Sequence, residues 1–239
     1  MRALIVINSL QKLNEAIAKG KLISDILDCE ISLIYVKEQE LFDFDITNFN
    51  VENANEIRMH IIKALKEQNL NWVVMAFEDD IIDNVNLQIN RQKINLTIID
   101  IKNFELIKDI KSPVLYNFKN RSDALIVLDE FLDINLKLIK KLTNNLKAIL
   151  VYEFFIAEPT FDIMQPIPID LELEEEIINQ TKKEFLNWAN ENKIEAKFFI
   201  GTIKLKEIEN EIKKSSFLIT NSLDAIELAL NDNKTILKV

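Results

Sequence analysis

The sequence predicts an α/β protein with two tandem five-stranded parallel sheets, each with helices on both faces. The string Ala-Leu-Ile-Val stands at residues 3–6 and recurs at residues 124–127. After each copy, short apolar runs alternate with segments of helical period in the same order, which indicates a long internal repeat. The apolar runs lack polar alternation, as is typical of parallel strands buried on both faces. We therefore predict two domains, residues 1–119 and 120–239.

Five strands and four helices are predicted in the first copy. The strands are expected at residues 4–7, 31–36, 72–77, 96–101 and 113–118. Between the first two strands, apolar or small residues follow helical spacing from Leu13 to Leu27. Gly20 falls on the inner side of this helix, where it costs about 1 kcal/mol of helix propensity but lets two backbones approach closely. The spacing therefore favours a packing role for Gly20 over a functional one.

The second copy repeats this order of elements. Its strands are expected at residues 124–127, 148–152, 196–200, 217–220 and 235–239. Leucine and isoleucine at helical spacing predict that its first helix continues through Leu146. Because parallel strands are joined by right-handed crossovers, each copy should form a sheet with helices on both faces.

The composition argues against several classes of protein. Hydrophobic residues make up 48% of the chain and charged residues 28%, as expected of a soluble globular protein. The formal net charge of −10 argues against nucleic-acid binding, which depends on Lys and Arg at phosphates. The apolar run from Ala3 to Ile7 is too short for a signal peptide or a membrane span. Cys29 is the single cysteine and cannot form an internal disulfide, so we expect a cytoplasmic protein without membrane contact.

No catalytic or metal-binding set is evident in the sequence. One Cys and one His exclude a Cys/His metal pattern, and there is no G-x-S-x-G elbow. Glu78, Asp79 and Asp80 could hold a divalent cation, or could form a solvated turn that caps the next helix. His60 borders a helical stripe, where a structural role and ligand or proton chemistry are both open. The sequence therefore favours a protein without a metal site and leaves an enzyme activity unsupported.

Candidate ligand residues lie in the loops that follow the first, second and fourth strands of each copy. Ligands of parallel α/β sheets bind beyond the carboxyl ends of the strands, where the strand order reverses. The candidates are Asn8, Ser9, Val36, Asp129, Asn221 and Ser222.

Aromatic residues are concentrated in the loops after the two second strands, although surface loops favour small polar residues. They are Phe42, Phe44 and Phe49 in the first copy and Phe154, Phe155 and Phe161 in the second. One interpretation is that these rings fold over the sheet ends and fill the space of a ligand. The other is that they form an apolar cleft or a surface for a protein partner of unknown identity.

Three strings, in this order and with this repeat, resemble the universal stress protein family in its tandem form. ALIVLDE at residues 124–130 resembles the family's first strand with its terminal acid, LIYV at 33–36 its second strand, and SPVLYNF at 112–118 its last strand. The resemblance implies a Rossmann-like five-stranded sheet in each copy and pairing of the two last strands within the chain. Both last strands are apolar edge candidates, which invite such pairing. A homodimer of whole chains is compatible with this scheme.

Many members of that family bind ATP through an acid after the first strand and a glycine-rich loop after the fourth. Asp129 matches the acid, whereas the first copy has Asn8. The chain has 2 glycines, and neither falls in residues 100–103 or 221–224, although phosphate loops depend on glycine backbone.

The resemblance, with this departure, implies a stress-response protein that acts through protein or small-ligand contacts, without ATP bound in the usual way and without another cofactor. The alternative is a nucleotide site, for ATP or AMP, that is altered in the second copy. Asp129 would then contact the base, and Asn221 or Ser222 the ribose or phosphates.

Overall fold

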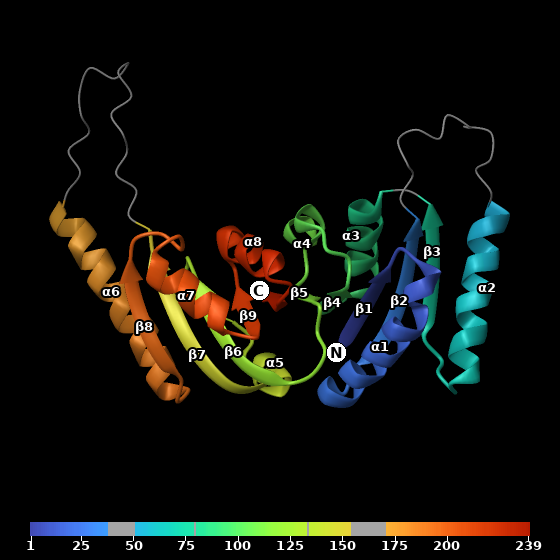
Figure 1. Ribbon diagram of the computed structural model, residues 1–239, viewed down its shortest axis with the longest axis horizontal. Helices are drawn as coiled ribbons and strands as arrows, with labels where there is room; N and C mark the ends of the chain where they lie inside the picture. The colour runs from blue at the N-terminus through green and yellow to red at the C-terminus, as the bar shows by residue number, and fades with distance from the viewer. Residues whose placement is uncertain (38–50, 79, 133, 154–170) are drawn as a thin grey trace, which may run out of the picture.

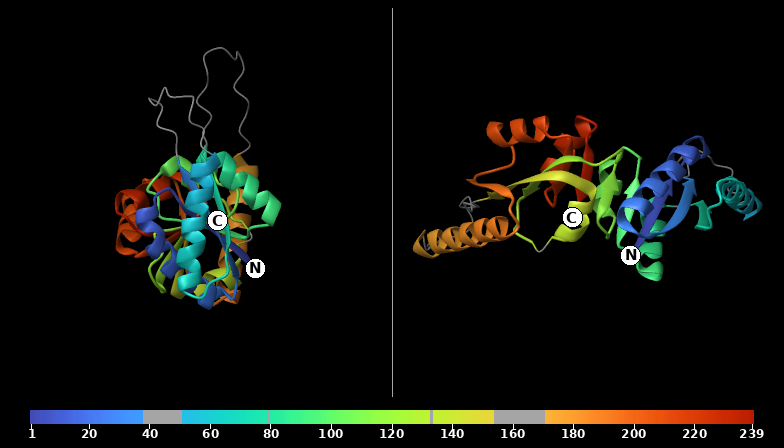
Figure 2. Two further views of the ribbon diagram at one scale, coloured as in Figure 1. Left: turned by 90° about the vertical axis from the view of Figure 1, so that its right-hand side faces the viewer. Right: turned by 90° about the horizontal axis from the view of Figure 1, so that it is seen from below.

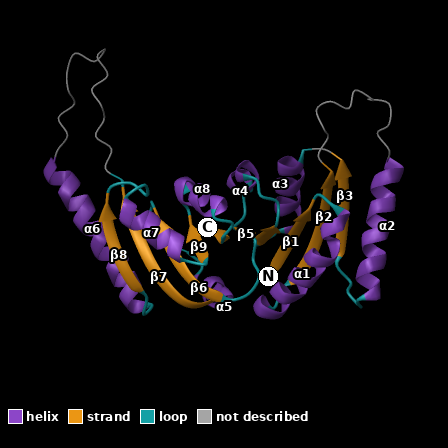
Figure 3. Ribbon diagram, in the orientation of Figure 1, coloured by secondary structure: helices purple, strands orange, loops and turns teal. Residues whose placement is uncertain are grey.

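The computed structural model describes residues 1–37, 51–78, 80–132, 134–153 and 171–239. These residues form one ten-stranded sheet with helices on both faces (Figures 1 and 3). The end-on view in Figure 2 shows the helices on either side of the sheet. The predicted α/β fold class is therefore confirmed. Among the described residues, no helix is long and apolar enough to cross a membrane.

The elements alternate strand and helix throughout. The first half contains β1 (Arg2–Ile7), the 3-10 turn η1 (Leu10–Lys12), α1 (Leu13–Leu27), β2 (Glu30–Lys37), α2 (Val51–Glu67), β3 (Val73–Glu78), α3 (Ile81–Gln92), β4 (Leu96–Ile99), α4 (Phe104–Asp109) and β5 (Val114–Tyr116). The second half contains β6 (Ser122–Leu128), α5 (Leu136–Leu142), β7 (Thr143–Tyr152), α6 (Leu171–Glu191), β8 (Glu195–Ile200), α7 (Lys206–Lys214), β9 (Phe217–Thr220), α8 (Leu223–Asn231) and β10 (Thr235–Lys238).

The two sets of five parallel strands are continuous with each other. The strand order is β3-β2-β1-β4-β5-β10-β9-β6-β7-β8. Strands within each half pair in parallel, and β5 pairs antiparallel with β10, with Leu115 opposite Leu237. Hydrogen bonds between the two last strands join the two predicted five-stranded sheets into one. The predicted boundary at residue 119 lies between β5 and β6, and the division into two domains stays a prediction.

Alternate side chains along the strands point to opposite faces of the sheet, and each face is covered by its own apolar cluster. Ile5 of β1 packs in a cluster with residues of α1, α2, α5 and α6. Val6, its neighbour, packs in a second cluster with residues of α3, α4, α7 and α8. Burying each such side chain contributes about 1.5–3 kcal/mol. The apolar runs without alternation therefore follow from a sheet that is covered on both faces.

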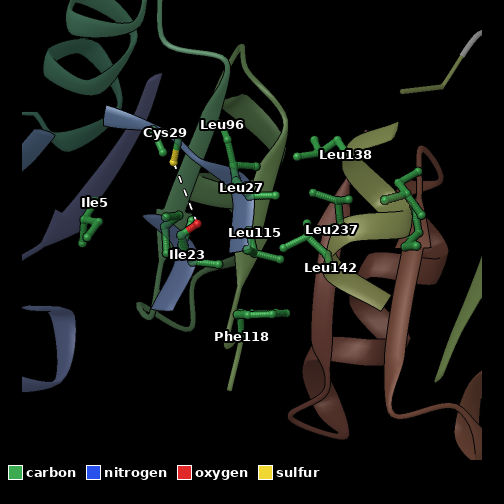
Figure 4. Close-up of a cluster of buried hydrophobic side chains, with 14 of the residues drawn as sticks. Ile5, Ile23, Leu27, Cys29, Leu96, Leu115, Phe118, Leu138, Leu142 and Leu237 are labelled. Atoms are coloured by element: carbon green, nitrogen blue, oxygen red, sulfur yellow. Dashed lines mark hydrogen bonds between the residues drawn. The ribbon is translucent and has the colours of Figure 1, made fainter. Parts of the chain in front are cut away.

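One core continues across the junction of the two halves. Leu115 and Leu237 are fully buried, as is Phe118, which follows β5. Phe118 packs edge to face on Phe217 of β9, with 6.1 Å between ring centroids. Figure 4 shows Leu115, Phe118 and Leu237 in this cluster, together with Leu27 of α1. Separation of the halves would expose this shared apolar surface to water.

Two polar side chains cross the junction in a pseudo-symmetric way. Tyr116 of β5 donates from its hydroxyl to Oδ1 of Asn233, which follows α8, at 3.2 Å. Lys238 of β10 donates from Nζ to the carbonyl oxygen of Lys108 at 3.0 Å and to that of Ile110, at the end of α4. Each last strand therefore binds the end of the other half's last helix.

We expect Lys238 to give the folded state a distinct pH dependence. Burial lowers the pKa of Lys238 from 10.5 to about 8, and the charge of Asp109 opposes this shift. Between these pH values the unfolded chain binds more protons at this site than the folded chain, so the folded state gains stability as pH rises. The free energy of unfolding of the wild type, relative to Lys238→Met, should therefore increase from pH 8 to pH 10.5 in urea titrations.

The control for this comparison is Lys137→Met, at an exposed lysine on α5. Its difference from the wild type should stay constant over the same pH range. Parallel curves for the wild type and Lys238→Met would contradict the assignment.

The first helix of the second half is shorter than the sequence pattern predicts. The pattern predicts a helix through Leu146, but α5 ends at Leu142 and β7 begins at Thr143. Arg121 donates from Nη2 to the carbonyl oxygen of Thr143 at 2.8 Å. This bond satisfies a carbonyl at the point where the helix stops. Leu146 therefore lies in the sheet.

Gly20 allows α1 to lie directly on the sheet. A Cβ atom on Gly20 would overlap the ring of Trp72 and lie 2.6 Å from Cδ1 of Ile5. Trp72 precedes β3 and Ile5 belongs to β1, so the contact spans three strands of the sheet. The packing interpretation of Gly20 is confirmed.

We expect Gly20→Ala to destabilise the protein although alanine favours a helix. Overpacking costs about 1–3 kcal/mol, whereas the gain in helix propensity is about 1 kcal/mol. Thermal unfolding should show a lower Tm than the wild type. In a Trp72→Leu background the same change should cost less, because part of the obstruction is gone. A Tm raised by Gly20→Ala in the wild-type background would contradict the packing assignment.

Candidate functional site

Each half of the sheet has one point where the strand order reverses. β1 lies between β2 and β4, and β6 lies between β7 and β9. Asn8 and Asp100 directly follow β1 and β4, and Asp129 and Asn221 directly follow β6 and β9. We call Asn8 with Asp100 the first switch-point pair, and Asp129 with Asn221 the second. The candidate site consists of these two pairs, because ligands of such sheets bind at this edge.

In the second pair, the Asn221 side chain holds the end of β6. Its Oδ1 accepts the backbone N–H of Asp129 at 3.2 Å, and its Nδ2 donates to the carbonyl oxygen of Glu130 at 3.0 Å. The structure thus brings together two of the residues predicted from sequence. Both polar atoms of the Asn221 amide are therefore hydrogen-bonded to backbone, whereas Asp129 is exposed.

In the first pair, the carboxylate of Asp100 forms an ion pair with Lys19 of α1. The Lys19 side chain is 8% exposed and that of Asp100 is 25% exposed. Oδ2 of Asp100 accepts from Nζ of Lys19. Oδ1 is buried and has no hydrogen-bond partner among the described residues. Lys12 also approaches the Asp100 carbonyl oxygen, at 3.5 Å. A lysine ammonium therefore occupies the space beside the first pair.

The two pairs carry the same residue types in exchanged positions. The first half has the amide after its first strand and the acid after its fourth, and the second half has the reverse. An amide after the fourth strand can donate to one backbone group and accept from another. A carboxylate at the same position can only accept, and its charge favours a nearby cation. Sequence reasoning missed Lys19 and Asp100. The available signal was a lysine beside the inner stripe of a helix and an acid aligned with Asn221.

The other candidate residues serve the fold. Ser9 accepts from the N–H of Gln11 through Oγ at 3.3 Å, at the start of η1. Val36 is fully buried in β2. Ser222 is 2% exposed, and its N–H donates to Oγ1 of Thr220 at 3.0 Å. The Val36 and Ser222 side chains therefore offer almost no surface to a ligand.

The phenylalanines of the aromatic loops lie outside the described residues, so both interpretations of them stay predictions. They are Phe42, Phe44, Phe49, Phe154, Phe155 and Phe161. In the acidic turn, the Asp80 side chain accepts from the N–H of Asp83 at 2.9 Å and caps α3.

The single histidine and the single cysteine lie apart from the switch-point pairs. His60 is exposed on α2. Cys29 is buried, and its burial raises the pKa of its thiol. Where side chains are described, no three His, Cys, Asp or Glu residues are grouped to hold a metal ion.

Solved structures share this fold along nearly the whole chain. A functionally unknown protein from Pseudomonas aeruginosa PAO1 matches with a TM-score of 0.62 and 12% identity, over 100% of this chain and 92% of that chain. A putative universal stress protein from Pseudomonas aeruginosa UCBPP-PA14 matches with a TM-score of 0.60 and 12% identity, over the same shares. A universal stress protein from Archaeoglobus fulgidus DSM 4304 matches with a TM-score of 0.57 and 14% identity, over 99% and 95%. No protein-family model and no curated protein sequence matches the chain.

The Lys19–Asp100 ion pair should be coupled energetically. Exposed ion pairs contribute about 0–1 kcal/mol, and breaking a fully buried pair costs about 3–5 kcal/mol. Since Asp100 is 25% exposed, we expect Lys19→Met to destabilise by roughly 1–3 kcal/mol, between these limits. Urea unfolding of Lys19→Met, Asp100→Asn and the double variant measures the coupling. If the destabilisation of the double variant equals the sum of the two single ones, the ion pair has no coupling energy and the prediction is wrong. Lys63→Met, at an exposed lysine on α2, is the matched control and should change stability little.

Proposed function

With a universal-stress-protein fold as the premise, we propose that this chain is a tandem protein of that kind which does not bind ATP in the family's usual way. It acts in the cytoplasm in a stress response, through contacts with proteins or small ligands and without catalysis. The resemblance of its strand sequences and the likeness of its fold to two solved universal stress proteins support this proposal.

The connections after β4 and β9 carry the proposal. β4 ends at Ile99 and α4 begins at Phe104, while β9 ends at Thr220 and α8 begins at Leu223. Neither connection contains glycine. A phosphate cradle needs several free backbone N–H groups in a loop that tolerates positive φ. The side chains of Asp100, Asn103 and Asn221 in these connections are bonded to other parts of the protein. Two short connections without glycine do not suit such a cradle.

Negative charge at the second switch-point pair also opposes phosphate binding. Asp129 and Glu130 follow β6, and Asp224 lies in the first turn of α8. Asp224 places its carboxylate where the helix dipole would otherwise favour an anionic ligand. Nζ of Lys204 lies 3.5 Å from Oδ1 of Asp224, and this ion pair offsets part of the negative charge.

The second candidate function is nucleotide binding at an altered site in the second half. It is favoured by one observation, the exposed carboxylate of Asp129 at the end of β6. A carboxylate can accept hydrogen bonds from the exocyclic amine of a base. The phosphates would then have to lie away from Asp224.

Equilibrium dialysis with ATP and ADP, with and without magnesium, tests the proposal. We expect no micromolar binding that depends on the second switch-point pair, because a phosphate loop is missing. Asp129→Ala is the diagnostic variant, and Asp25→Ala, at an exposed acid on α1, is its control. Micromolar nucleotide binding that is lost in Asp129→Ala and kept in Asp25→Ala would reject the proposal and establish the altered site.

A further inference from the structure

A polar cavity of about 350 Å³ lies at the junction of the two halves, beside the starts of β6 and β10. One wall contains Asn117, Lys119 and Arg121. These residues belong to the segment that links β5 to β6, whose path Figure 1 shows. The other wall includes Ser216 and Lys234, next to β9 and β10. Neither switch-point pair is among its described lining residues. The cavity is therefore separate from the candidate site described above.

The described lining of this cavity is positively charged and contains no acid. Its charged residues are Lys119, Arg121 and Lys234, in a chain with a formal net charge of −10. None of the three forms an ion pair with a described residue. Cations that gather in one hollow without partners of opposite charge attract anions.

Two of these cations are held in place by backbone carbonyls. Nζ of Lys234 donates to the carbonyl oxygens of Lys213 at 2.8 Å and Ser215 at 2.7 Å. Nη2 of Arg121 donates to the carbonyl oxygen of Thr143. Neutral carbonyls orient a cation without cancelling its charge, and both side chains keep further N–H donors. Charge that is already oriented loses less conformational entropy when a ligand binds.

We propose that the junction cavity binds a small phosphorylated anion, either an inorganic phosphate species or a phosphate ester. Arg and Lys are the side chains that best hold phosphate oxygens, and the Arg guanidinium can do so with two parallel bonds. The Asn120 amide and the Ser122 hydroxyl add neutral donors to the lining. The volume of about 350 Å³ lies within the range of about 300–1,000 Å³ for small-molecule sites. The inference does not rest on the proposed function.

The test compares the full chain with its Lys119→Gln variant. Lys119 is exposed and makes no hydrogen bond or ion pair that the described residues show, so its loss should leave the fold intact. Pyrophosphate, inorganic phosphate and ribose 5-phosphate are titrated calorimetrically at constant ionic strength, and amide NMR shifts locate the binding. We expect at least one of them to bind, with shifts at residues 117–122 and 233–235. The Kd should rise about tenfold in Lys119→Gln, because hydrogen bonds to charged groups are among the stronger ones.

Two further variants complete the design. Lys183→Gln removes an exposed charge on α6 and should bind like the wild type, as should Asp129→Ala, which separates this site from the second switch-point pair. Tighter binding of ribose 5-phosphate than of phosphate and pyrophosphate indicates an ester ligand, and the reverse order indicates an inorganic one. The proposal is overturned if none of the three anions binds, if Lys119→Gln binds as tightly as the wild type, or if the shifts map elsewhere.

Discussion

The antiparallel pairing of β5 with β10 is the contact on which the rest of the structure depends. Each of these strands would otherwise be the exposed edge of a five-stranded sheet, with unpaired backbone groups. Their pairing buries Leu115 against Leu237 and brings Phe118 onto Phe217, so the two halves share one core. It also brings α1 of the first half near α5 of the second, where Lys141 donates to the carbonyl oxygen of Leu27 at 3.3 Å.

Packing of α1 on the first half of the sheet connects the core to the switch point. Gly20 has no side chain to hold the helix away from Trp72 and Ile5. Its neighbour Lys19 is thereby carried over the sheet to Asp100 at the end of β4. A helix forced outward by a larger residue would move the ammonium group away from the acid. The ion pair at the first switch-point pair is thus a consequence of close helix packing.

The second switch-point pair and the junction cavity differ in charge, although the chain as a whole is acidic. The second switch-point pair has Asp129 and Glu130 beside it, whereas the junction cavity has Arg121 and Lys234 and no acid in its described lining. This separation follows from where the cations are used. Arg121 donates to the carbonyl oxygen of Thr143, just after α5, and Lys234 donates to carbonyl oxygens at the end of α7. Both side chains therefore stabilise the fold near the amino ends of the strands. A phosphate-binding role there would add to a structural one.

The order of elements, the repeat and the two-sided burial of the strands were determined by the sequence itself, because they depend on neighbouring residues and on the period of apolar positions. The absence of glycine from residues 100–103 and 221–224 was readable for the same reason, since a loop's composition is local. Only the tertiary structure decided the contacts of the site. Lys19 meets Asp100 across 81 positions and Asn221 meets Asp129 across 92. Where α5 ends, the carbonyl of Thr143 is likewise bound by Arg121, which lies outside that helix. Such contacts depend on which strand ends adjoin in space, and no periodicity along the chain records that.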